Sequence, residues 1–191
     1  MAKKENNFNE SDEKLEEYAS QEELALVKTE LAICPELNNP VAGTIISIAK
    51  NYAKSVMITT HDMVVDSQGL IFDGFVFTAA NYVAQAAINK EFTVLIGSKC
   101  FFYAPLKVGD VLELEAQALF DDNSKKRDVK ILGHIKDIKI FEATLQFIST
   151  EEHIFKLKRP PAVTQKPKEE NNNVAAANPE AMAMSLLSTM K

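Results

Sequence analysis

Apolar and polar residues alternate along two segments in the second half of the chain. These segments run from Val111 to Leu119 and from Ile138 to Ile148. The polar residues of this alternation are Glu113, Glu115 and Gln117 in the first segment, and Glu142, Thr144 and Gln146 in the second. A period of two predicts strands of a sheet that is covered on one face. The residues expected on that covered face are Leu112, Leu114, Ala116 and Ala118 in the first segment, and Phe141, Ala143, Leu145 and Phe147 in the second.

The segment from Phe75 to Asn89 has a different pattern. It is rich in alanine, and as a helix it would be apolar on nearly every side. A helix of that kind is buried rather than laid on a surface. Runs of β-branched and apolar residues predict further strands before and after it, with a turn at residues 121–124. These runs are Thr44 to Ala49, Lys54 to Thr60, Thr93 to Tyr103 and Val129 to Lys136.

A second helix is predicted near the N-terminus. Ser11 is a candidate N-cap, acidic residues follow it, and a loose stripe of apolar residues continues toward Pro35, before which a helix is expected to end. Too few basic residues lie on this helix for it to read DNA. It is expected to pack on the body of the protein or on a partner subunit.

Charge divides the chain into three parts. Residues 1–40 contain four lysines and ten acids, residues 41–156 contain 12 basic and 14 acidic residues, and residues 157–191 contain five basic and three acidic residues. These boundaries predict an acidic N-terminal arm, a globular domain and a flexible linker. The linker ends in an apolar segment, Ala181 to Met190, that is either disordered or docks on a protein partner.

The overall composition excludes several classes of protein. A formal net charge of -6 argues against a nucleic-acid-binding protein. No apolar run is long enough for a membrane helix, and no signal peptide is recognisable. The two cysteines, Cys34 and Cys100, are too few for a disulfide framework, which favours a cytoplasmic location. The three histidines lack ligand spacing, so no metal site is expected.

Three sequence pieces, in order, resemble hotdog-fold acyl-CoA thioesterases of the phenylacetate-pathway type. Gly69 to Tyr82 resembles that family's glycine-containing turn into its helix, Tyr103 to Leu112 resembles its P-x-x-x-G-D entry to the next strand, and Phe141 to Phe147 resembles its last strand. The resemblance implies an α+β hotdog fold, in which an antiparallel sheet wraps around one long buried helix. It also implies a homodimer that takes acyl-CoA as ligand and needs no further cofactor.

By the same resemblance, the ligand site lies where the buried helix begins. The thioester carbonyl would accept hydrogen bonds from backbone amides near Gly74 and Phe75, where first-turn amides are unpaired and the helix dipole is positive. The family's turn histidine, however, falls on Phe72, its first motif glycine on Asp73, and its catalytic helix acid on Asn81. An amide neither takes up a proton near neutral pH nor attacks as a carboxylate does.

Four polar residues on this helix complete the predicted ligand-binding set. They are spaced by three or four positions on an otherwise apolar helix, and their side chains need partners if they are buried. The sequence leaves open whether they contact a ligand or bond to each other across the helix pair of a dimer. They are Thr78, Asn81, Tyr82 and Gln85.

Three functions remain open. The first is binding or sensing of an acyl thioester without hydrolysis, as in the effector domain of the bacterial fatty-acid synthesis regulator, which the chain also resembles. The second is a thioesterase that uses Asp73, Asp66 or Asp62 as its carboxylate. The third is a non-enzymatic scaffold. The chain is further similar to flagella-coregulated hotdog proteins of Campylobacter-like bacteria, which implies a role in flagella-associated virulence.

Overall fold

A computed structural model describes residues 13–37, 39–119 and 124–156. The chain divides into two compact units, residues 1–157 and 158–191, and the second lies wholly outside the described residues. The predictions for the C-terminal linker, and for most of the turn at 121–124, therefore stay predictions. So does the division between the arm and the globular domain near residue 40. No described helix is both long and apolar enough to cross a membrane.

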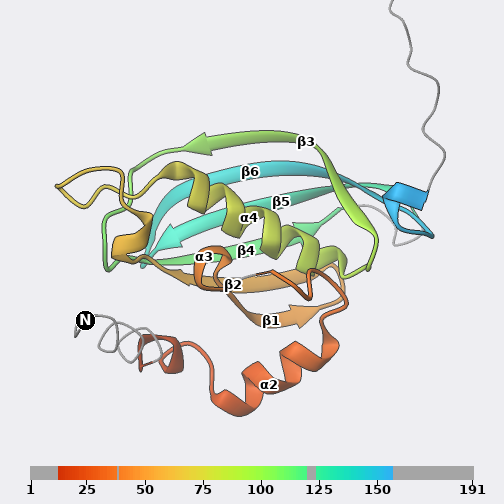
Figure 1. The fold of residues 1–191 in the computed structure, drawn as a ribbon, viewed down its shortest axis with the longest axis horizontal. Helices are drawn as coiled ribbons and strands as arrows, with labels where there is room; N and C mark the ends of the chain where they lie inside the picture. Colours follow the sequence, from red (N-terminus) through yellow and green to blue (C-terminus); the bar gives the residue numbers. More distant parts are fainter. Residues whose placement is uncertain (1–12, 38, 120–123, 157–191) are drawn as a thin grey trace, which may run out of the picture. The chain divides into compact units, whose positions relative to one another are not determined.

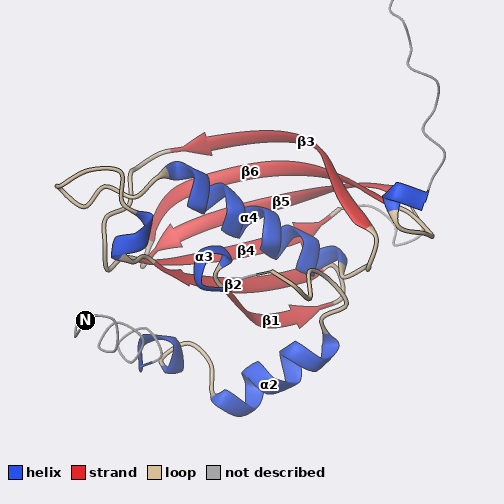
Figure 2. Cartoon of the chain, in the orientation of Figure 1, coloured by secondary structure: helices blue, strands red, loops and turns tan. Residues whose placement is uncertain are grey.

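Six strands form one sheet in the order β1-β2-β4-β5-β6-β3, and every pairing is antiparallel (Figures 1 and 2). The two alternating segments found in the sequence are central strands, and their predicted inward residues are all buried. The predicted strands are confirmed, and the first two of them pair with each other as an antiparallel hairpin. Their bounds are β1 Thr44–Ala49, β2 Tyr52–Ile58, β3 Thr93–Phe102, β4 Val111–Ala118, β5 Lys126–Ile135 and β6 Ile138–Ser149.

The long helix α4, Asp73–Ile88, lies across the inner face of this sheet (Figure 1). It packs mainly on β4 and β2, and Val76 and Val83 are fully enclosed at that contact. Small alanines let the helix approach the sheet closely, and each enclosed valine contributes about 1.5–3 kcal/mol of hydrophobic stabilisation. The predicted buried helix is confirmed, and with it the α+β hotdog arrangement of a sheet wrapped around one helix.

The N-terminal helix differs from its prediction, because it is broken into two pieces. Residues 13–16 are helical, a turn follows, and α2 spans Gln21–Glu30. Ser20 begins α2 with a capping box: the Glu23 amide donates to the Ser20 hydroxyl at 3.3 Å, and the Ser20 amide donates to the Glu23 carboxylate at 2.8 Å. This motif satisfies amides that a continuous helix would pair with carbonyls of its preceding turn. The proposed cap Ser11 lies outside the described residues.

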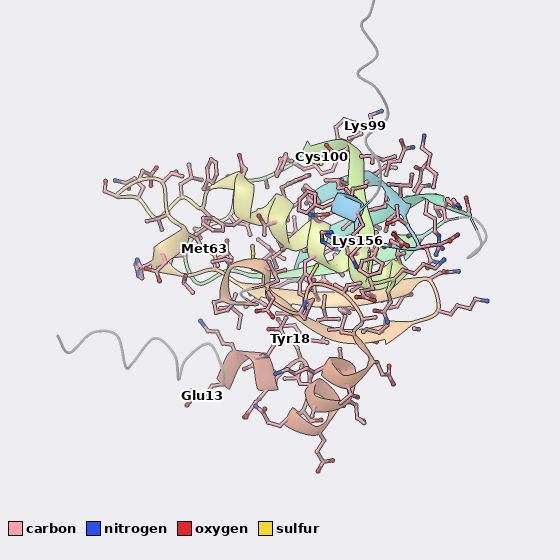
Figure 3. The ribbon with its side chains drawn as sticks, turned by 45° about the vertical axis from the view of Figure 1, so that its right-hand side comes forward. Glu13, Tyr18, Met63, Lys99, Cys100 and Lys156 are labelled. Atoms are coloured by element: carbon pink, nitrogen blue, oxygen red, sulfur yellow. The ribbon has the colours of Figure 1, made fainter. Side chains whose placement is uncertain are left out.

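The arm packs on the body of the protein, as expected from the sequence. Helix α2 contacts β1, and Ala19 is buried. Burial raises the pKa of Tyr18, and the nearby carboxylate of Glu113 on β4 raises it further. Figure 3 places Tyr18 between the arm and the sheet. The tyrosine ring therefore helps to attach the arm to the outer side of the domain.

Two further features link distant parts of the described chain. A short helix, α3 Asn39–Ala42, leads into β1 and contacts α4. Arg127 on β5 is 1% exposed, and its Nη2 donates to Oδ1 of Asn51 at 2.7 Å in the β1–β2 turn. That turn residue has a left-handed φ of 61°. The 3-10 turns η1 His61–Met63 and η2 Ile154–Lys156 complete the described elements.

Candidate functional site at the start of helix α4

The loop before α4 is held rigidly against the β3–β4 connection. The Ile71 amide donates to the Leu106 carbonyl at 2.9 Å, and the Phe72 amide donates to the Met63 carbonyl at 2.9 Å. Oδ1 of Asp66 accepts the amides of Gln68 and Leu70 at 2.9 and 3.1 Å. These bonds fix the point at which α4 begins. They also give the Asp66 carboxylate a structural role in its own loop.

The first turn of α4 presents a pair of unused backbone donors. The amides of Asp73 and Gly74 have no hydrogen-bond partner among the described residues, whereas the Phe75 amide donates to the Phe72 carbonyl at 3.0 Å. Phe72 is the N-cap, and its side chain makes no capping bond. The donors predicted near Gly74 and Phe75 are therefore better placed on Asp73 and Gly74. They lie at the positive end of a 16-residue helix.

The ring of Phe72 stands directly over Gly74. A Cβ added at Gly74 would come within 2.8 Å of Cδ1 of that ring and closer still to its Cε1. The ring is 57% exposed and meets Phe75 edge-on, with the ring centroids 6.3 Å apart. Glycine is thus required for this close approach. Phe72 forms an exposed apolar cover beside the two free amides.

Three of the four predicted polar residues share the partly exposed side of α4. We call Gly74, Thr78, Asn81 and Gln85 the α4 stripe. Thr78 Oγ1 donates to the Gly74 carbonyl at 2.9 Å, and Gln85 Nε2 donates to Asn81 Oδ1 at 3.4 Å. Tyr82 is instead buried, and this burial raises the pKa of its hydroxyl. The stripe residues bond along their own helix, while bonding across a dimer stays a prediction.

No carboxylate lies on the α4 stripe. Asp73 is exposed at the first position of α4, and Asp62 is exposed in η1. Among the described residues, no cluster of three or more histidine, cysteine or acidic side chains is arranged to hold a metal ion. The polar groups assembled here are hydrogen-bond donors and acceptors. They suit binding of a carbonyl better than abstraction of a proton.

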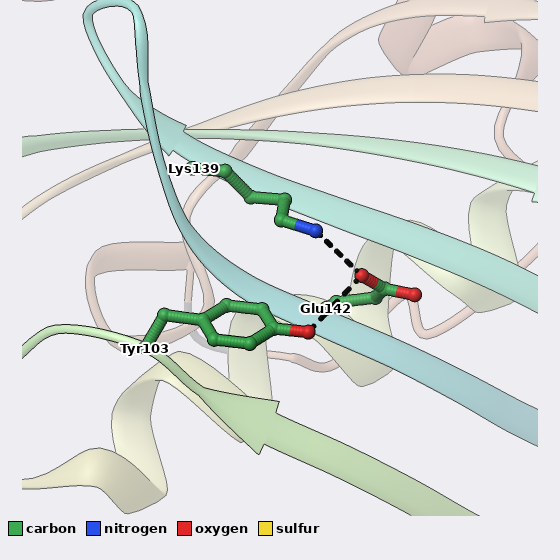
Figure 4. A network of polar contacts seen from close by, with 3 residues as sticks. All are labelled: Tyr103, Lys139 and Glu142. Carbon is green, nitrogen blue, oxygen red and sulfur yellow. Dashed lines mark hydrogen bonds and ion pairs between the residues drawn. The ribbon is translucent and has the colours of Figure 1, made fainter.

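A separate polar network lies on the outer face of the sheet. Glu142 Oε2 accepts from Lys139 Nζ at 2.8 Å and from the Tyr103 hydroxyl at 3.2 Å (Figure 4). The bond from Lys139 lowers the pKa of Glu142, and the same bond raises that of Lys139. A hollow of about 390 Å³ on this face is lined by Glu142, Leu132 and neighbouring residues. This network of Tyr103, Lys139 and Glu142 was not predicted from the sequence, and it contains none of the predicted site residues.

Comparison with known proteins identifies the family. No protein-family model matches the sequence. The crystal structure of Cj0977, a sigma28-regulated virulence protein from Campylobacter jejuni, is 71% identical in sequence and superposes with a TM-score of 0.72. The match covers 73% of this chain and 98% of Cj0977. This chain belongs to the Cj0977 family. An uncharacterized protein from Pyrococcus horikoshii, PH1136, is 30% identical with a TM-score of 0.59, over 62% of this chain and 90% of its own.

More distant structures share the hotdog fold of the Cj0977 family. One of them is smu.793 from Streptococcus mutans, which was solved bound to acetyl CoA. It is 15% identical with a TM-score of 0.55, over 63% of this chain and 98% of its own. A methylthioribose-1-phosphate isomerase from Aquifex aeolicus is 33% identical over 116 residues, or 61% of this chain. This chain spans only about a quarter of that protein's length, 24%.

Proposed function

We propose that the protein binds an acyl thioester, acyl-CoA, at the start of α4 and leaves it intact. The observation that carries this proposal is the pair of unpartnered amides of Asp73 and Gly74 beside a helix stripe without a carboxylate. A thioester carbonyl oxygen accepts hydrogen bonds, and unpartnered amides at a helix N-terminus would polarise it. The acetyl-CoA bound to the hotdog relative smu.793 supports this choice of ligand.

The residues present favour binding over hydrolysis. Hydrolysis needs a group that activates water or attacks the carbonyl, and the stripe supplies only a threonine, an asparagine and a glutamine. Thr78 donates its hydroxyl proton to a helix carbonyl, and Asn81 accepts from Gln85. Phe72 places an apolar ring where the thioesterases that the sequence resembles carry a histidine. Asp73 carries one of the free amides, and its exposed carboxylate has no catalytic role in this function.

A second copy of the chain would complete the site. Among the described strands, the edge strand β3 pairs only with β6, and it carries the exposed apolar residues Ile96, Phe101 and Phe102. The α4 stripe and the half-buried Phe75 are also incompletely covered within one chain. A homodimer would shield these groups and form the second wall around an acyl chain. Light scattering at micromolar concentration is expected to give a dimer, and a monomer would contradict this assignment.

The cellular setting follows from the ligand and the relatives. Cys34 and Cys100 are free thiols, which suits the reducing cytoplasm that we propose as the location. Because Cj0977 is a virulence protein, we extend its role in virulence to this chain as part of the proposal. A gene deletion complemented by wild type, but not by a variant that cannot bind acyl-CoA, would link the two roles. Equal complementation by both would separate them.

Calorimetric titration with acetyl-CoA, using free CoA as the matched control, tests the binding proposal. We expect saturable binding of acetyl-CoA, and weaker binding of CoA, which lacks the carbonyl. Release of free thiol from acetyl-CoA should stay close to the uncatalysed rate over the same period. Equal affinity for both compounds would show that the amides do not recognise the carbonyl. Rapid thiol release would show that the protein is a thioesterase.

A further inference from the structure

The two edges of the sheet differ in what lies beside them. Among the described strands, β1 pairs only with β2, and β3 pairs only with β6. An unpaired edge presents free N–H and C=O groups that can pair with a strand of another chain. Each edge strand contains a bulge, so the bulges do not distinguish the two edges. The difference is the N-terminal arm, because its helix α2 lies beside β1, at the opposite edge from β3 (Figures 1 and 3).

One end of the arm lies on the outer face of the sheet. Lys54 Nζ is 2.8 Å from Oε2 of Glu113, and these side chains point away from α4. Their direction follows from the alternation along β2, since Ala53 and Met57 belong to the core that contains α4. Burial raises the pKa of Tyr18, and the Glu113 carboxylate raises it further. Tyr18 therefore sits beside this outer ion pair.

A small buried contact lies beneath the arm on the same face. Val56 of β2 is paired with Glu113, so its side chain also points to the outer face. Val56 is nevertheless only 2% exposed, and it does not belong to the core that contains α4. Ala19 of the arm is likewise buried outside that core. Because the arm is the described segment that reaches this side of β2, it supplies the cover of Val56.

The other end of the arm is fastened on the inner face, at the C-terminal end of α4. Asn89 ends α4 in the left-handed conformation, with φ of 48°. Its Nδ2 donates to the Glu30 carbonyl at 2.9 Å, and its Oδ1 accepts from the Ala32 amide at 2.9 Å. Ile33 follows and is buried in the core that contains α4. The arm thus passes from the outer face to the inner face around the β1 edge.

We propose that the arm is a cap that prevents the β1 edge from pairing with a second copy of this chain. Helix α2 has ten residues, which is too short for stability alone in water, and none of its side chains is fully buried. Its position therefore depends on the attachments at its two ends. With the arm released, the sheet would have two open edges, which permits open-ended assembly, whereas a single open edge closes as a pair. No ligand is involved, so the cap stands or falls separately from acyl-CoA binding.

A double variant of the full chain, Ala19→Glu with Asn89→Gly, is designed to release the arm. The glutamate brings a charge into a buried position, and glycine suits the left-handed position while it removes both side-chain bonds. The matched control is Leu26→Glu, which adds the same charge to α2 at a residue that is 64% exposed. Adding Ser47→Lys, at an exposed position within β1, tests for edge pairing, because an edge lysine opposes it.

Two measurements report the outcome. Hydrogen exchange at the Ala32 amide shows whether the arm has been released, and light scattering over a range of micromolar concentrations gives the mass. Wild type and Leu26→Glu should exchange slowly at Ala32 and have the same mass. The double variant should exchange faster and reach about twice the wild-type mass or more, increasing with concentration. Ser47→Lys added to the double variant should restore the wild-type mass while exchange stays fast.

Three results would overturn the cap. The first is an unchanged mass in a variant whose arm has been released. The second is a set of larger species that Ser47→Lys leaves unchanged, since these would come from unspecific aggregation. If the double variant does not fold, Asn89→Gly alone carries the same comparison. The third is exchange at Ala32 that stays slow in Asn89→Gly, because the arm would then be held by other contacts.

Discussion

Replacing Gly74 by alanine should separate folding from ligand binding. The added methyl group would collide with the ring of Phe72, which must swing away from the start of α4. That movement loses the edge contact with Phe75, worth about 0.5–1.5 kcal/mol. Alanine in place of glycine within a helix returns roughly 1 kcal/mol. The two effects nearly cancel, so the free energy of unfolding should change by less than about 1 kcal/mol.

Ligand affinity should respond much more strongly to the same change. The new methyl group would crowd the approach to the Asp73 and Gly74 amides, and the ring of Phe72 would no longer cover them, so acetyl-CoA affinity should fall about tenfold or more. The matched control is Gly97→Ala on β3, where a Cβ would make only ordinary contacts with Gln146 at 3.7 Å. Thermal unfolding and calorimetric titration give the two quantities. Unchanged affinity in a folded Gly74→Ala protein would refute the assignment of these amides as the carbonyl site.

Three more predictions follow from particular side chains. Asn81→Asp should raise the rate of thioester hydrolysis, measured as thiol release, at least about tenfold, because it restores a carboxylate to the α4 stripe. If wild type instead turns over near 1 per second and Asp73→Asn abolishes that activity, Asp73 is the catalytic carboxylate. Asn51→Gly should lower stability by about 1–3 kcal/mol in urea unfolding, because the buried Arg127 loses an acceptor; an unchanged midpoint would show that the bond is dispensable. Burial raises the pKa of the Cys34 thiol, so the folded state holds this proton more tightly than the unfolded state does. The protonated thiol therefore favours the folded state at neutral pH, and this contribution is lost as pH rises through the raised pKa. Alkylation of Cys34 should therefore be slower in the folded than in the unfolded chain at pH 8, and equal rates would contradict its burial.

Much of the fold could be predicted because the local patterns match the final environments. The alternating residues of β4 and β6 face one enclosed side, and the alanine-rich segment is buried except along the partly exposed α4 stripe. The break before α2 was missed, although Ser20 and Glu23 carry the capping-box spacing. The acidic residues and loose apolar stripe suggested one continuous helix. In the structure, the capping box at Ser20 and Glu23 starts a new helix despite this longer pattern.

The candidate site was only partly predictable, because its decisive contacts join distant positions. The sequence placed Phe72 and Gly74 where the buried helix begins and Asn81 within that helix, and the structure has them there. It gave no sign that Phe75 would use its amide within the turn. Asn89 follows the predicted helix, as a left-handed cap often does, but its bonds to residues 30 and 32 depend on tertiary packing.

Amide NMR of the 15N-labelled protein during titration with acetyl-CoA tests the central claim most directly. The account predicts that the amide protons of Asp73 and Gly74 move downfield more than any others, because they gain a hydrogen bond. The Phe75 amide, which is already bonded to Phe72, should shift less. The thioester should stay intact throughout. Saturable binding that leaves Asp73 and Gly74 unshifted, with the largest changes at Leu132 and Glu142 in the outer hollow, would contradict the account.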